Sequence, residues 1–189
     1  MPGSATPGYR WKTILVVLLL ITGVGGAQAV DFNTTQQQQH QMWQSLVVQL
    51  GSENHVRAIE SSSYSDAMLS INTTPGRCLS PWLEMRSDLG ENQSLDDRVN
   101  DVPADVLVGD HYTLTGRAEL LTERGDNGLY VRFYDLDMPT LLQQMREGDE
   151  LHLRIRMTED VEDYWFMTFS LAGAEDALSR MNQLCFSLG

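Results

Sequence analysis

The two cysteines of the chain, Cys78 and Cys185, are its strongest candidates for covalent chemistry. Cys185 falls on the apolar side of a predicted C-terminal helix, near its end, where the helix dipole disfavours a thiolate. Cys78 follows Arg77, and a basic neighbour favours a thiolate, so Cys78 is the better candidate for a nucleophile. In an exported chain, two cysteines far apart in sequence usually form a disulfide. A disulfide is the favoured interpretation, with a reactive Cys78 or two free thiols as alternatives.

The neighbouring residues Asp110 and His111 could supply a general base, with the carboxylate orienting the imidazole toward a serine. The sequence has no GxSxG elbow and no HExxH, GxGxxG or Walker A motif. We therefore expect no catalytic residues and no cofactor, and we keep a secreted hydrolase as the alternative hypothesis.

The sequence offers little for a metal ion. Its four histidines are scattered, and no pair has HxH or HxxxH spacing. The acidic run at residues 94–101 is similar to a calcium loop, but it lacks the glycine and the closing glutamate of that motif. We expect no metal site, and a calcium site on this acidic loop belongs to the hydrolase alternative.

The N-terminus is typical of an export signal. Arg10 and Lys12 precede an apolar run at residues 14–24, and Ala27-Gln28-Ala29 matches the small-x-small cleavage pattern. A retained membrane anchor is the alternative, but the apolar run is much shorter than the roughly 20 residues that a spanning helix needs. We therefore predict a signal peptide at residues 1–29, a single mature domain at residues 30–189, and a periplasmic or secreted protein.

The charge of the chain limits its partners. The net charge is −13, and removal of residues 1–29 would leave 11 arginines, no lysine and 26 acidic residues, a net charge of −15. So acidic a surface repels phosphate backbones and anionic headgroups. We expect no nucleic-acid binding and no membrane insertion after signal cleavage; another envelope or secreted protein is the expected partner.

Hydrophobic periodicity is ambiguous in the first half of the mature chain. A helix is predicted from residue 36 to residue 50, because five apolar residues there follow helical spacing: Met42, Trp43, Leu46, Val47 and Leu50. A strand at residues 45–50 is the competing interpretation. Short strands are predicted at residues 67–71 and 79–86, the latter at an edge or starting at Pro81. Residues 87–110 are the most loop-like stretch, because acids outnumber large apolar residues.

The second half is clearer. Alternating residues predict strands at residues 112–123 and 129–133, joined by the hairpin-turn sequence Gly125–Gly128. Asp137 is placed to cap a short helix that Gly148 ends. A second pair of strands is expected at residues 151–158 and 164–171, joined by a charged turn, and a helix follows Gly173. The order β-β-α-β-β-α indicates an α+β domain of antiparallel hairpins packed by helices.

The C-terminal stretch resembles the ending of small exported bacterial proteins of the VasI/TagO kind, which accompany type VI secretion systems. The shared features are Phe169-Ser170-Leu171-Ala172-Gly173 running into a helix that closes with Cys185, and the pair Arg77-Cys78. The resemblance implies a non-catalytic periplasmic accessory protein, and it carries over only the disulfide between Cys78 and Cys185.

Two classes of function remain. The first is an exported, non-catalytic binding or accessory protein, linked to a secretion system or the cell envelope. Its expected interface is the polar face of the strand at residues 151–158, where His152, Arg154 and Arg156 form a basic stripe; a solvated strand face is the simpler alternative. The second class is the hydrolase that would use Asp110 and His111 or the acidic loop.

Overall fold

The computed structural model describes residues 33–50, 52–88, 101–122, 128–156 and 164–189. These residues form a mostly-β fold, a single antiparallel sheet of ten strands, and two helices. Its elements are β1 (Asn33–His40), β2 (Trp43–Leu50), β3 (Glu53–Glu60), β4 (Ala67–Thr73), β5 (Trp82–Asp88), β6 (Val102–Val108), β7 (Leu114–Leu121), β8 (Gly128–Tyr134), α1 (Met138–Glu147), β9 (Glu150–Arg156), β10 (Tyr164–Ser170) and α2 (Ala174–Leu188).

The strand order in the sheet is β1-β2-β3-β4-β5-β8-β7-β6-β9-β10. Our expectation of an α+β domain, with hairpins packed by helices, is therefore wrong, because all the described strands join one sheet. The order of elements from β7 to α2 is nevertheless the predicted β-β-α-β-β-α. What the sequence did not show is that six further strands, β1 to β6, belong to the same sheet.

The predicted helix over residues 36–50 is also wrong, because this stretch forms the hairpin of β1 and β2. Trp43 and Val47 face the core, while Leu46 and Val48, which alternate with them, are also buried. A strand buried on both faces has a continuous apolar run, and such a run can match helical spacing by chance. The competing interpretation, a strand at residues 45–50, is closer to the structure.

The two strands predicted between residues 67 and 86 are present, whereas the loop predicted at residues 87–110 is only partly so. The strand predicted at residues 67–71 is present as β4. Strand β5 begins directly after Pro81, which agrees with a strand start at this proline and not with an edge strand, because β5 lies between β4 and β8. The expectation of a loop across residues 87–110 is wrong at its end, because β6 lies between β7 and β9 within the sheet. Four predicted features lie wholly or mostly outside the described residues. They are the signal peptide (within residues 1–32), most of the acidic run (89–100), most of the hairpin turn (123–127) and the charged turn (157–163).

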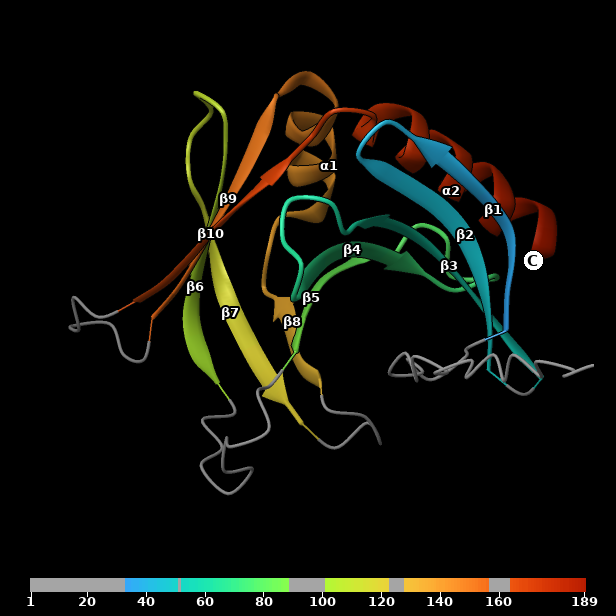
Figure 1. The fold of residues 1–189 in the computed structure, drawn as a ribbon, viewed down its shortest axis with the longest axis horizontal. Coiled ribbons are helices and arrows are strands. Elements are labelled where there is room, and N and C mark those ends of the chain that lie inside the picture. The colour runs from blue at the N-terminus through green and yellow to red at the C-terminus, as the bar shows by residue number, and fades with distance from the viewer. Residues whose placement is uncertain (1–32, 51, 89–100, 123–127, 157–163) are drawn as a thin grey trace, which may run out of the picture.

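Both helices pack on the core face of the sheet. Helix α2 lies along β2 and β3 and contacts α1, as Figure 1 shows. Its buried residues recur every three or four positions and join the core cluster: Ala174, Ala177, Leu178, Met181, Leu184 and Cys185. Burying a side chain of the size of Leu178 or Met181 contributes roughly 1.5–3 kcal/mol, so this helix is held by packing. No helix among the described residues is long and apolar enough to cross a membrane.

The C-terminal half of β10 is tied to the other end of the sheet. Ser170 O accepts a hydrogen bond from Trp43 Nε1 at 2.8 Å, and the Met42 amide donates to Ala172 O at 3.1 Å. The rings of Tyr64 and Phe169 meet edge to face with centroids 5.3 Å apart. In Figure 1 the chain then passes from β10 to α2, beside β1 and β2.

The predicted cap of α1 is confirmed. Asp137 accepts a hydrogen bond from the Thr140 amide at 3.2 Å and another from the Thr140 hydroxyl at 2.7 Å, and Gly148 ends the helix. These hydrogen bonds stabilise the ionised carboxylate and hold the pKa of Asp137 below its ordinary value of 3.8.

Replacing Asp137 with alanine should lower the midpoint of urea unfolding at pH 7, because the Thr140 amide loses its acceptor. A carboxyl with a lowered pKa stabilises the fold above its unfolded value and loses that effect as the pH falls through its folded value. The difference between wild type and Asp137→Ala should therefore shrink as the pH falls below about 4. Asp137→Asn, which keeps an acceptor, serves as control; an equal loss in both variants would contradict this role of the cap.

Candidate functional site

Strand β9 places His152, Arg154 and Arg156 on the face of the sheet opposite the buried residues Leu151 and Leu153. We call this face, across β6, β9 and β10, the outer face. The basic stripe predicted from the sequence therefore lies on one side of one strand. What the stripe contacts decides whether it is only a solvated strand face.

Arg154 is held by a buried acid on the neighbouring strand. Asp105 on β6 lies opposite Arg154 in the register, and its side chain is only 6% exposed. Arg154 Nε donates to Asp105 Oδ2 at 2.8 Å, Nη2 lies 2.6 Å from the same oxygen, and Arg156 Nε lies 3.5 Å from it. A buried carboxylate needs such partners. The pair therefore fixes the Arg154 guanidinium in place, while 47% of the side chain remains exposed.

An exposed aromatic ring stands beside this arginine. Phe166 on β10 is the cross-strand neighbour of Arg154 and is 53% exposed. Its ring stacks on the imidazole of His152, with centroids 5.7 Å apart and planes 16° apart. His152 Nδ1 forms a hydrogen bond with Thr168 Oγ1 at 2.9 Å, and its Nε2 lies 3.9 Å from the Glu150 carboxylate. These contacts fix the orientations of both rings.

These side chains surround a surface hollow of about 340 Å³, which we call the β9 hollow: it is lined by Asp105, Leu107, Thr113, His152, Arg154 and Phe166. It combines a guanidinium, an imidazole and an apolar wall from Leu107 and Phe166. Such a mixture can bind a group that carries both an apolar part and an acceptor. None of its lining residues is a cysteine or serine nucleophile, and the described residues hold no group of three or more His, Cys, Asp or Glu side chains arranged for a metal ion.

A second polar cluster on the outer face is fully engaged within the protein. Arg117 on β7 and Tyr134 on β8 both hydrogen bond to the carboxylate of Asp101, just before β6. The bond from Arg117 holds the pKa of Asp101 below its usual value, and the carboxylate in turn raises the pKa of Tyr134. This cluster joins the start of β6 to the middle of β7 and the end of β8, and it does not line the hollow.

The two cysteines form the predicted disulfide. Cys78 and Cys185 are bonded, at a sequence separation of 107, and both are buried. The bond attaches α2 to the turn between β4 and β5. Neither sulfur is available as a nucleophile, so the reactive-thiol alternative is excluded for the bonded protein.

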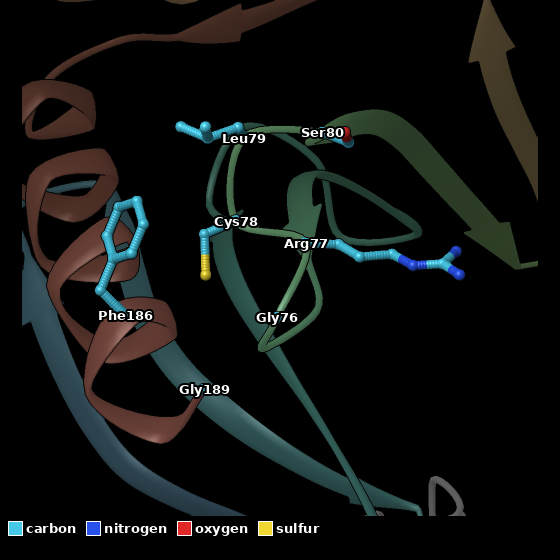
Figure 2. Close-up of a pocket in the computed structure, with 7 residues that line it drawn as sticks. All are labelled: Gly76, Arg77, Cys78, Leu79, Ser80, Phe186 and Gly189. Atoms are coloured by element: carbon cyan, nitrogen blue, oxygen red, sulfur yellow. The ribbon is translucent and has the colours of Figure 1, made fainter.

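Beside the disulfide lies a second surface hollow, of about 360 Å³, which we call the disulfide hollow: its lining is Gly76, Arg77, Cys78, Leu79, Ser80, Phe186 and Gly189. In Figure 2, Phe186 and Leu79 extend into the space between α2 and the turn, while the Arg77 side chain points away from Phe186. Leu79 is 88% exposed and Phe186 is 62% exposed. Besides these apolar side chains, Arg77 and Ser80 line the hollow. Among the described residues no side-chain hydrogen bond or ion pair orients either of them, in contrast to Arg154 and His152 of the β9 hollow.

The residues of the hydrolase hypothesis are not assembled. Asp110 and His111 lie in the turn between β6 and β7, where the His111 amide donates to Val108 O at 3.0 Å. Within the described part of the chain, neither side chain hydrogen bonds to a hydroxyl group that could serve as a nucleophile. Of the acidic run at residues 94–101, only Asp101 is described, and its carboxylate is bound to Arg117 and Tyr134.

Four residues that line the β9 hollow were not predicted from the sequence as part of a site: Asp105, Leu107, Thr113 and Phe166. Asp105 lay in the stretch expected to be a loop, although Val102, Ala104 and Val106 alternate with it in the manner of a strand. Phe166 likewise alternates with its neighbours, since Trp165 and Met167 on either side of it turn toward the core. This alternation could have placed Asp105 and Phe166 each on the polar face of its own strand, but it could not have shown that the two lie close together.

No protein-family model matches this chain, and no curated protein matches it. Among solved structures, the chain is similar to the crystal structure of invasion associated protein B from Bartonella henselae, with a TM-score of 0.55. The two share 12% sequence identity over 79% of this chain and 97% of that one. At this identity the likeness shows a common fold, and the resemblance to VasI/TagO-like proteins stays a prediction.

Proposed function

We propose that this protein is an exported, non-catalytic accessory protein of the bacterial cell envelope that binds another extracytoplasmic protein through the β9 hollow. The observation that carries the proposal is the pairing of a half-exposed Arg154, fixed by buried Asp105, with the exposed ring of Phe166. Arginine and aromatic side chains dominate the binding energy of protein interfaces, especially where they are held in place before binding.

Three further observations support this proposal. The disulfide between Cys78 and Cys185 is typical of proteins in oxidising compartments outside the cytoplasm. The structurally similar protein from Bartonella henselae is named for an association with invasion, which fits a role at the bacterial surface. The lining of the β9 hollow offers oriented groups for binding and neither a cysteine nor a serine, which favours recognition over hydrolysis. A link to a secretion system rests on the sequence resemblance alone.

Site-specific photo-crosslinking in the native host tests the proposal. A benzophenone amino acid at position 166 should crosslink to one discrete extracytoplasmic protein, because Phe166 borders the hollow. Adding Arg154→Gln should lower the crosslink yield at least fivefold, a loss of about 1 kcal/mol in binding.

The same crosslinker at position 186 is the matched control, because Phe186 is also more than half exposed but lines the disulfide hollow. It should not yield the same product. A product shared by both positions, or a yield that Arg154→Gln leaves unchanged, would contradict binding through the β9 hollow.

A further inference from the structure

Strand β10 ends the sheet, so one of its edges faces β9 and the other faces away. The Leu171 amide donates toward the β9 side, to Asp149 O, at 2.8 Å. The amides of Thr168 and Ser170 point the other way, because they donate to Tyr64 Oη and Ser63 Oγ. The N–H and C=O groups of successive residues point alternately to the two edges of a strand. Those of the even-numbered residues of β10 therefore point to the edge that faces away from β9, which we call the outer edge.

This outer edge is covered along only half of its length. The loop between β3 and β4 supplies the hydroxyls that cap Thr168 and Ser170, at 2.9 Å and 3.1 Å. By the same alternation, the N–H and C=O groups of Tyr164 and Phe166 point to the outer edge. In the described part of the chain they meet no hydrogen-bond partner, so this half offers a strand-pairing edge.

The open half lacks the usual protection of an edge strand. Proteins blunt edges with bulges, prolines, or charged side chains. At the other end of the sheet, β1 has a bulge between Thr35 and Gln38, with Gln36 at a φ of 55°. Strand β10 instead keeps regular register with β9 over all seven of its residues, and Tyr164, Trp165 and Phe166 at its open half are uncharged.

The side chains beside the open edge indicate what could pair there. Phe166 and Tyr164 are exposed on the outer face, and their rings lie 6.5 Å apart edge to face, forming an apolar shelf. Arg154 lies one strand further in, and 47% of its side chain stays exposed beside the buried Asp105. The exposed part of this guanidinium favours a carboxylate, which a guanidinium binds in a fork geometry.

We propose that an extended segment of the partner protein adds as an eleventh strand at the open half of β10 and places an acidic side chain against Arg154. The added strand would lie about 4.8 Å from β10, so a side chain opposite Phe166 can lie over its ring and reach toward Arg154. This inference rests on the proposed function, and it specifies the partner segment as extended and acidic. Backbone pairing supplies affinity, while Arg154 and Phe166 select the side chain.

Binding of short synthetic peptides by fluorescence anisotropy tests this inference. The probes are labelled eight-residue peptides of alternating threonine and valine, with one glutamate placed at each position in turn, and a matched set with lysine. At least one glutamate peptide should bind at or below 1 mM and at least fivefold more tightly than its lysine counterpart. Methylating alternate amides along one edge of that peptide should weaken binding at least tenfold, because a pairing edge loses its donors.

Protein variants locate the binding. Phe166→Ala should weaken the glutamate peptide about fivefold and Phe166→Pro at least tenfold, because proline removes the outward N–H as well as the ring. Arg154→Gln should abolish the preference for glutamate over lysine. Tyr112→Ala, at another exposed aromatic residue, should leave all affinities unchanged. If Phe166→Pro does not fold, the comparison of methylated with unmethylated peptides on the wild-type protein still tests backbone pairing.

Three results would overturn the inference: no glutamate peptide binding at 1 mM, equal binding of methylated peptides, or a dimer of the protein that Phe166→Pro dissociates. The last result would assign the edge to a second copy of the chain. Any of these results combined with an Arg154-dependent crosslink at position 166 would leave the proposed function standing and remove only strand addition. Loss of that crosslink as well would remove both.

Discussion

Replacing Cys78 with serine should lower the free energy of unfolding by about 2–5 kcal/mol. The bond closes a loop with a sequence separation of 107 residues, and in the chain-entropy model a loop of that length contributes roughly 4–5 kcal/mol. Cys185→Ser should cost about as much, because either change removes the same covalent link. Urea unfolding of the two variants and of wild type under non-reducing conditions measures the effect.

The double variant Cys78→Ser, Cys185→Ser distinguishes a crosslink from two separate packing effects. Since the two residues act as a unit, the double variant should be no less stable than either single variant. Mass spectrometry after alkylation should detect no modified cysteine in the native protein and two in the reduced, unfolded protein. A native thiol that alkylates readily would contradict the disulfide and make Cys78, next to Arg77, a candidate reactive residue.

Replacing Gly173 with alanine should cost at least about 3 kcal/mol of unfolding free energy. Gly173 precedes α2 and has a φ of 91°, where an L side chain is strained. An added Cβ would also lie only 1.8 Å from the carbonyl oxygen of His40. The turn between β1 and β2 must then move away from the start of α2, and the contact between Met42 and Ala172 is lost with it.

Gly76 provides a matched control for this substitution. Its φ is 83°, close to that of Gly173, but a Cβ there would meet no atom within 4 Å. Gly76→Ala should therefore show only the backbone strain, about 1–2 kcal/mol. Thermal or urea unfolding of both variants separates strain from collision. Equal losses in the two would show that the close approach of His40 to Gly173 contributes nothing.

The part of the fold that could be predicted from sequence is the part whose strands bury only one face. In β9, Leu151, Leu153 and Ile155 are buried while His152 and Arg154 are not, so the sequence alternates cleanly. The cap at Asp137 was predictable for a similar reason, because capping depends on residues only three positions apart.

Strand β2 was harder to predict because it is buried on both faces. In β2, Val47 and Val48 are adjacent and both buried, so the pattern that distinguishes a strand from a helix disappears. Strand β6 was hidden for another reason: Pro103 and Asp105, which are typical of loops, lie within it, and only its place between β7 and β9 explains why they are buried.

The candidate site could be predicted only in part. The sequence places His152, Arg154 and Arg156 on one polar face, and the structure agrees. The residues that orient them are distant in sequence: Asp105 is 49 residues from Arg154, and Thr168 is 16 residues from His152. The register of neighbouring strands decides which residues pair, and the hydrophobic periodicity of one strand does not reveal that register.

Binding of the labelled, purified protein to the envelope fraction of its own host tests the central claim most directly. The wild type should bind saturably, and Arg154→Gln and Phe166→Ala should each weaken binding at least tenfold, because both side chains line the β9 hollow. Phe186→Ala, in the disulfide hollow, should bind as the wild type does. Normal binding by the first two variants together with loss of binding by Phe186→Ala would contradict the account and move the binding surface to the disulfide hollow.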